Sequence, residues 1–159
     1  MGENLFTLEI DIRAIEGIAN AFEKFPAIAR QEFGRAIKKL VLRIERKAKR
    51  HCPVATGKLR ASITATVESW AYAFVATNTE YAPWVEFGTD PHDITPSTAS
   101  ALTIPTDDGT ILRKKVRHPG TDPQPFMEPA YEYGKKIAPE IFGDALKRIQ
   151  ARLLAEARS

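Results

Sequence analysis

The sequence has little cysteine and no long hydrophobic run, and each shortage excludes a class of protein. The single cysteine, Cys52, cannot form an intrachain disulfide, which argues against a disulfide-stapled domain and suits synthesis in a reducing cytoplasm. No apolar stretch approaches the roughly 20 residues that a membrane-spanning helix needs, so we expect no membrane partner. The first residues also lack the basic-then-apolar order of a signal peptide.

Residue patterns that carry catalytic chemistry are also scarce. Nucleotide-binding glycine patterns and nucleophile motifs are missing. Cys52 is best interpreted as a small buried residue at a helix end, and the pair Asp107-Asp108 as part of a turn. The histidines are too dispersed along the chain for a metal-binding motif: His51, His92 and His118. We therefore expect no enzyme activity, no metal and no cofactor.

The composition that remains is that of one globular domain. The chain has 159 residues, of which 43% are hydrophobic and 27% charged, which favours a single folded domain over residues 1–159. The net charge of +3 is small, but its distribution is uneven. Residues 1–29 are acidic, whereas residues 30–60 hold eleven lysines or arginines against two glutamates. The strongest charge asymmetry therefore lies in the first third of the chain.

Hydrophobic periodicity predicts the elements of the first half. Alternation predicts a strand over 4–12, and helical spacing predicts a short helix over 13–25 and a second helix from Pro26 to about His51. Residues 59–67 and 71–77 are rich in alternating and β-branched side chains, which predicts two strands joined in an antiparallel hairpin. The apolar stripe of the second helix consists of Phe33, Ile37, Leu40, Val41, Ile44 and Ala48.

The second half contains a long proline-rich segment. Residues 81–87 predict a helical turn closed by Gly88. Residues 88–125 hold six of the eleven prolines and predict an irregular connection with one hairpin around residues 107–109. Residues 126–157 predict a long helix kinked at Pro139. We therefore expect an α+β fold, with a small antiparallel sheet packed against helices on one face, a long proline-rich loop and hairpin arm, and a long C-terminal helix.

Two clusters of basic residues each have two interpretations. The first, on the helix over 30–50, is either a solvated helix face or a surface that contacts phosphates. The second, in the proline-rich arm, is either a hairpin kept soluble by its charge or a loop that projects toward a polyanion. Neither cluster has the partner helix or interleaved aromatic residues of sequence-specific nucleic-acid binding.

Three patches, taken in order and spacing, resemble a known family. They are Pro53–Ile63, Tyr81–Thr89, and His118–Thr121 continuing through Gln124–Ala130. The ordered set, over about Ala27 to the end of the chain, resembles the putative tail-component family of long-tailed bacteriophages, which are neck or tail-completion proteins. The residues that carry the resemblance are Thr56, Gly57, Leu59, Arg60, Glu86, Phe87, Gly88, Thr89, Pro125, Phe126 and Pro129.

The resemblance implies a structural virion protein that is made in the host cytoplasm and assembles as a ring at the head-to-tail junction. We expect a homo-oligomer, with a hexamer favoured, that contacts head-closure or connector proteins and tail-tube or tail-terminator proteins. Double-stranded DNA would pass through the lumen without sequence readout. The predicted DNA-channel residues are those of the arm hairpin: Arg113, Lys114, Lys115 and Arg117.

Two further hypotheses concern single features of the sequence. Arg60 and Glu86 are the charged members of otherwise turn-like or apolar patches, which suggests that they pair within the fold or across a subunit boundary. The alternative function is a sequence-independent nucleic-acid-binding protein that uses the basic helix over 30–50.

Overall fold

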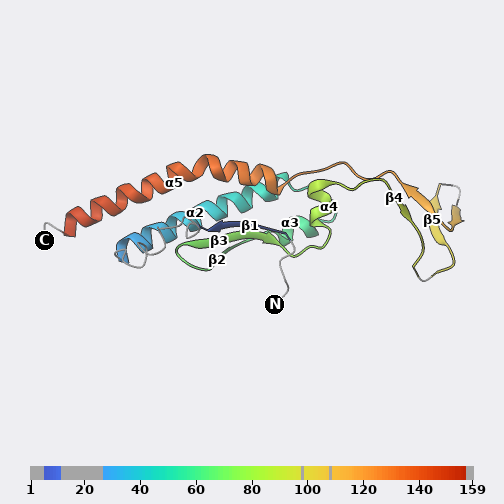
Figure 1. Ribbon diagram of the computed structural model, residues 1–159, viewed down its shortest axis with the longest axis horizontal. Coiled ribbons are helices and arrows are strands. Elements are labelled where there is room, and N and C mark those ends of the chain that lie inside the picture. The colour runs from blue at the N-terminus through green and yellow to red at the C-terminus, as the bar shows by residue number, and fades with distance from the viewer. Residues whose placement is uncertain (1–5, 12–26, 98, 108, 157–159) are drawn as a thin grey trace.

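A computed structural model describes residues 6–11, 27–97, 99–107 and 109–156 of the chain. Its body contains a three-stranded antiparallel sheet, ordered β1-β3-β2, with the two long helices on one side of it (Figure 1). A narrow arm projects from one end of the body, and the C-terminal end of the last helix lies at the other end (Figure 1). The expected α+β class is confirmed. The predicted short helix over 13–25 lies outside the described residues.

Helix α2, Ala27–His51, is the centre of the core. All six residues of the predicted apolar stripe are buried. Ala36 lies within the stripe, and Ala29 extends it toward the start of the helix. One edge of this stripe packs on β2, Thr64–Val67, and β3, Tyr72–Thr77, and the other packs on the last helix. The helix is therefore covered on two sides, while its basic residues lie off the buried stripe.

Helix α5, Met127–Glu156, packs along α2. Its buried contacts come from Met127, Ile141, Ala145 and Ile149. Gly134 allows a close approach, because a β-carbon there would lie 2.6 Å from Cδ1 of Ile44. Pro139 lies inside α5, whose axis bends in Figure 1, as expected where a proline removes one backbone donor.

The segment between α2 and β3 differs from the prediction at one point. Residues 59–63 were expected to begin a strand, but Lys58–Ser62 form the short helix α3 and the strand β2 begins only at Thr64. The hydroxyl of Ser62 explains the change, since it bonds back to the carbonyl of Leu59 at 2.8 Å and also contacts the hydroxyls of Thr77 and Thr79. This local bonding competes with a strand ladder. The hairpin of β2 and β3 is confirmed.

Strand β1, Phe6–Asp11, confirms the predicted opening strand and pairs with β3. Helix α4, Ala82–Phe87, confirms the predicted helical turn and ends at Gly88, whose φ is 73°. The arm beyond it is more regular than expected. The predicted hairpin is present as β5, Leu102–Thr106, and β6, Gly109–Arg113. A second antiparallel pair, which the sequence prediction missed, joins β4, His92–Ile94, to β7, Val116–His118.

Candidate functional site

The three motif patches meet at the base of the arm. Residues of the first patch, including Thr56, Gly57 and Leu59, line a small hollow together with Tyr81 and Val85 of the second. The third patch bonds to the second, because the amide of Gln124 donates to the carbonyl of Val85 at 2.8 Å. Segments up to about seventy residues apart in the chain are thus joined where the arm leaves the body.

Glu86 is the buried polar centre of this arm base. It belongs to α4, and only 3% of the residue is exposed. Its carboxylate accepts hydrogen bonds from the amides of Phe126 at 2.8 Å, Met127 at 2.9 Å and Glu128 at 2.8 Å. These amides start α5 and have no partner within that helix. Glu86 therefore caps α5 from another element, and its negative charge suits the positive end of the helix dipole.

The hypothesis of an Arg60–Glu86 ion pair is wrong within one chain. Among the described residues, the bonds to the Glu86 carboxylate come from the three α5 amides and none comes from a guanidinium. Arg60 is exposed on α3, whereas Glu86 is buried. Pairing across a subunit boundary, the other form of the hypothesis, stays a prediction. The sequence pattern correctly singled out Arg60 and Glu86 as unusual charges. In the fold, however, the carboxylate of Glu86 lies at the start of α5, where free backbone amides donate charge-assisted hydrogen bonds to it.

The other motif residues have structural positions around this centre. Phe126 is fully buried, and its ring meets that of Phe6 edge-to-face at 6.3 Å. Pro125 is exposed, and Pro129 lies half-buried in the first turn of α5, where a missing amide proton costs little. Phe87 is 67% exposed despite its motif position. Its ring meets that of Phe6 edge-to-face at 5.8 Å.

Two glycines allow the two segments of the arm to approach each other closely at its base. Thr89 and Thr121 exchange both backbone hydrogen bonds at 3.0 Å, which closes the base of the arm. Gly88 and Gly120 flank this bridge with φ of 73° and 89°, and a β-carbon at either position would collide with a carbonyl of the opposite segment. Only glycine combines this backbone conformation with so close an approach.

The predicted DNA-channel residues lie along the outer arm and are all exposed. Lys115 and Arg117 both reach the carboxylate of Asp93, at 2.7 and 3.5 Å. Arg113 and Lys114 have no ion-pair partner among the described residues. Two of the four cations therefore share one carboxylate of β4, which offsets part of their charge.

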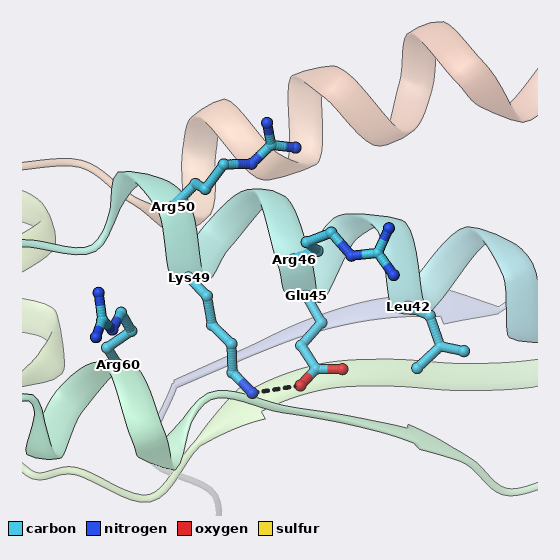
Figure 2. Close-up of a pocket in the computed structure, with 6 residues that line it drawn as sticks. All are labelled: Leu42, Glu45, Arg46, Lys49, Arg50 and Arg60. Carbon is cyan, nitrogen blue, oxygen red and sulfur yellow. Dashed lines mark hydrogen bonds and ion pairs between the residues drawn. The ribbon is translucent and has the colours of Figure 1, made fainter.

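A second cationic surface lies in a groove between α2 and α3 (Figure 2). The groove, of about 640 Å³, is lined by Leu42, Glu45, Arg46, Lys49, Arg50 and Arg60. Lys49 bonds to Glu45 at 2.5 Å, four residues earlier in the helix. The three arginines have no ion-pair partner among the described residues, and their side chains are exposed. The prediction from the sequence included the helix charges but did not place Arg60 beside them.

A cluster around Glu32 was not predicted from the sequence. Glu32 is 1% exposed and accepts bonds from Arg35 at 2.7 Å, Arg148 at 2.8 Å and Arg152 at 3.1 Å. The hydrogen bond from Arg148 is the main cause that holds the pKa of Glu32 below its ordinary value, with Arg152 and Arg35 adding to it against the opposing effect of burial. The cluster joins the start of α2 to the end of α5. Its only signal in the sequence was that Glu32 is one of two glutamates within the basic run over 30–60.

The histidines, interpreted as dispersed, include two that meet in space. His92 and His118 are cross-strand partners of β4 and β7, and their rings stack at 5.1 Å. Within the described residues, no group of three or more histidines, cysteines or acidic residues could hold a metal ion. Cys52 is buried at the end of α2, as predicted, and burial raises the pKa of its thiol. In the described part of the chain, no helix has the length and apolar character of a membrane span.

Comparisons with known proteins identify one family. No curated protein and no solved structure matched the chain. Residues 16–88 match the model of the family described as "Bacteriophage HK97-gp10, putative tail-component". The match contains the first motif patch and all of the second except Thr89, and it ends at Gly88, so the third patch and most of the arm lie beyond it.

The description of the matched family also bears on the function of the protein. The family is one of phage tail components, which indicates a structural role in a phage tail or neck, a place in the virion and contacts with other virion proteins. The resemblance inferred from the sequence is confirmed over the matched residues, since residues 16–88 are similar to the HK97-gp10-like putative phage tail components.

Proposed function

We propose that the protein is a structural component that forms a ring at the head-to-tail junction of a long-tailed phage or phage-like particle. The observation that carries this proposal, beside the family match, is the arm. Its β5–β6 ribbon leaves Ile111 and Leu112 exposed, at 40% and 65%, with no body of its own to pack against. An extended arm with uncovered apolar side chains is suited to reach a neighbouring subunit.

A ring follows if each arm contacts the next subunit in the same way. Arm and body are different surfaces, so their contact is heterologous and closes only when successive rotations complete a circle. We expect a hexamer. Its two faces would contact the head-closure or connector proteins and the tail-tube or terminator proteins. The proposal includes no catalytic step.

The lumen would contact DNA through phosphates, which carry no base information. The arm hairpin is our first candidate for this surface because charges on a projecting loop can converge on a ring axis. It supplies Arg113 and Lys114 as unpaired cations, with Lys115 and Arg117 shared with Asp93. Repetition around a ring multiplies this charge, and salt would weaken the contact.

The groove of Arg46, Arg50 and Arg60 supports a second candidate function. Three arginines without ion-pair partners among the described residues form a more concentrated positive surface than the arm. A monomer could bind duplex DNA through this groove without sequence preference. This is the nucleic-acid-binding alternative, now with Arg60 of α3 added to the basic helix.

Two sets of substitutions separate these possibilities. One replaces Arg113, Lys114, Lys115 and Arg117 by glutamine, and the other replaces Arg46, Arg50 and Arg60 by glutamine. Because all seven side chains are exposed, both variants should fold, which circular dichroism would check. If the arm lines the channel, only the first variant should lose DNA retention in assembled particles. Lys115→Gln with Arg117→Gln alone should lose part of that retention while still forming rings.

The remaining outcomes are equally informative. If the groove variant alone loses salt-dependent binding to short duplex DNA as a monomer, the nucleic-acid-binding alternative gains support. If neither variant changes DNA retention across a salt series, the assignment of both surfaces to DNA is wrong. A chain that never appears in particles would contradict the structural role itself.

A further inference from the structure

An apolar groove runs along the free edge of β1, beside α4 and α5. One hollow of about 350 Å³ is lined by Phe6, Leu8, Phe87 and Met127, and a second of about 260 Å³ continues past Leu8. Tyr131 lines both hollows and is 45% exposed. In the described sheet, β1 pairs with β3 alone, so its other edge opens onto this groove. We call this surface the β1–α5 groove.

The β5–β6 ribbon has one apolar face that fits such a groove. Pairing places Leu102 opposite Arg113 and Ile104 opposite Ile111. Because side chains alternate along a strand, Leu102, Ile104 and Ile111 share one face, whereas Leu112 lies on the other. A two-stranded ribbon by itself is at best marginally stable in water, so covering this face would stabilise it.

The unpaired charges at the two surfaces are complementary, and Lys135, the one cation that lines the two hollows, is already paired with Glu132. Arg113, at the end of the apolar face, and the adjacent Lys114 have no ion-pair partner among the described residues. Glu9 and Glu128 line the two hollows of the groove, are exposed, and likewise form no ion pair in the described part of the chain. Opposite charges at the rim of an interface favour the correct register and exclude wrong ones.

The partner of the groove must come from a different copy of the chain. The arm extends away from the body, and its ribbon lies far beyond the end where β1, α4 and α5 meet (Figure 1). The base of the arm is closed by the Thr89–Thr121 bridge, which holds the two arm segments together where they leave the body. Two surfaces that are complementary but distant on one molecule make a heterologous contact between copies.

We propose that the apolar face of the β5–β6 ribbon docks into the β1–α5 groove of a neighbouring copy, with Arg113 and Lys114 facing Glu9 and Glu128. The inference rests on the proposed ring and names its subunit contact. It assigns Arg113 and Lys114 to the protein contact, so the part of the arm that would face the lumen is narrowed to Lys115 and Arg117, which share Asp93.

Disulfide trapping tests the contact with a matched control. In a Cys52→Ala background, the full-length chain carries Ile111→Cys and Tyr131→Cys, is concentrated, and is oxidised mildly. The control pairs Tyr131→Cys with Leu112→Cys, which lies on the opposite face of the ribbon and is more exposed. We expect a ladder of covalent oligomers at least about tenfold stronger for Ile111 than for Leu112, although random collision would favour Leu112.

Charge reversal gives a second, independent readout. Arg113→Glu and Glu128→Arg should each weaken self-association, measured by sedimentation, by about tenfold, and the two together should restore it to within about threefold. Glu140→Arg is the control, since Glu140 is exposed on α5 outside the groove and should have little effect.

The docking proposal and the ring proposal can be refuted by different results. Rings that form without the Ile111–Tyr131 crosslink, or reversals that are not rescued in the double variant, would overturn the docking and leave the ring intact. Strong protection of the groove from hydrogen exchange in a verified monomer would also overturn it, because the same chain would then cover the groove. Absence of the chain from the head-to-tail junction would overturn the proposed function instead.

Discussion

Glu86 gives the sharpest test of how the arm base is held. Its carboxylate takes three amides of α5, of which those of Phe126 and Met127 are buried and that of Glu128 is partly exposed. Glu86→Ala removes the acceptor and leaves two buried donors without a partner, while water can reach the third.

The expected cost follows from the number of buried donors. Each buried amide that loses its only acceptor costs about 1–3 kcal/mol, so Glu86→Ala should lower the free energy of unfolding by about 3–5 kcal/mol. Glu86→Gln keeps one acceptor oxygen and loses the charge at the helix start, which predicts a loss of about 1–2 kcal/mol. Arg60→Ala should cost under about 0.5 kcal/mol, because the side chain is exposed.

Chemical denaturation of the three variants measures these differences, provided that the slope with denaturant is unchanged. Hydrogen exchange should become faster at the Phe126 and Met127 amides of Glu86→Ala well before global unfolding. A loss below about 1 kcal/mol for Glu86→Ala would refute the capping argument. So would a coupling above about 1 kcal/mol between Arg60→Ala and Glu86→Ala, which would restore the ion pair.

Four other perturbations have definite expected outcomes. The pKa of Glu32 is lowered in the folded state. The ion-pair cluster therefore stabilises the fold above the ordinary glutamate pKa of 4.5, and this stability is lost as pH falls through the folded pKa. Glu32→Gln should abolish this part of the acid dependence of unfolding. Gly120→Ala should release the arm root and speed exchange at the bridge amides, whereas Gly143→Ala, with open space around its β-carbon, should be neutral or stabilising by up to about 1 kcal/mol in thermal unfolding. Cys52→Ala should leave assembly intact, with a modest stability loss of about 1–2 kcal/mol by denaturation. Hydrogen exchange should show weak protection across residues 88–125 in a monomer and strong protection after assembly.

Periodicity predicted the body of the fold well because burial follows it directly. The stripe from Phe33 to Ala48 forms the core face of α2, and alternation located β1 and β3. It failed at residues 59–62, where the hydroxyl of Ser62 bonds locally and extends a short helix. The sequence prediction missed β4, which is only three residues long. Its strand character depends on pairing with β7, and this pairing cannot be seen in the residue pattern.

The sequence identified the residues of the candidate site but not the groups to which they bond. The motif patches selected Glu86, Gly88 and Phe126, which meet at the arm base. The partner of Glu86 is a set of backbone amides, and backbone groups leave no sign in the residue pattern. Glu32 likewise depends on Arg148, which is more than a hundred residues away in sequence. Long-range charge pairing needs the helix packing to be known first.

The central claim is that the protein is a ring component at the head-to-tail junction, and one measurement tests it most directly. Cryo-electron microscopy of particles from the phage or prophage that encodes this chain would image that junction. The account predicts a closed ring of identical copies in which each arm lies across the next body. A junction without density for this fold, in particles complete with head and tail, would contradict it.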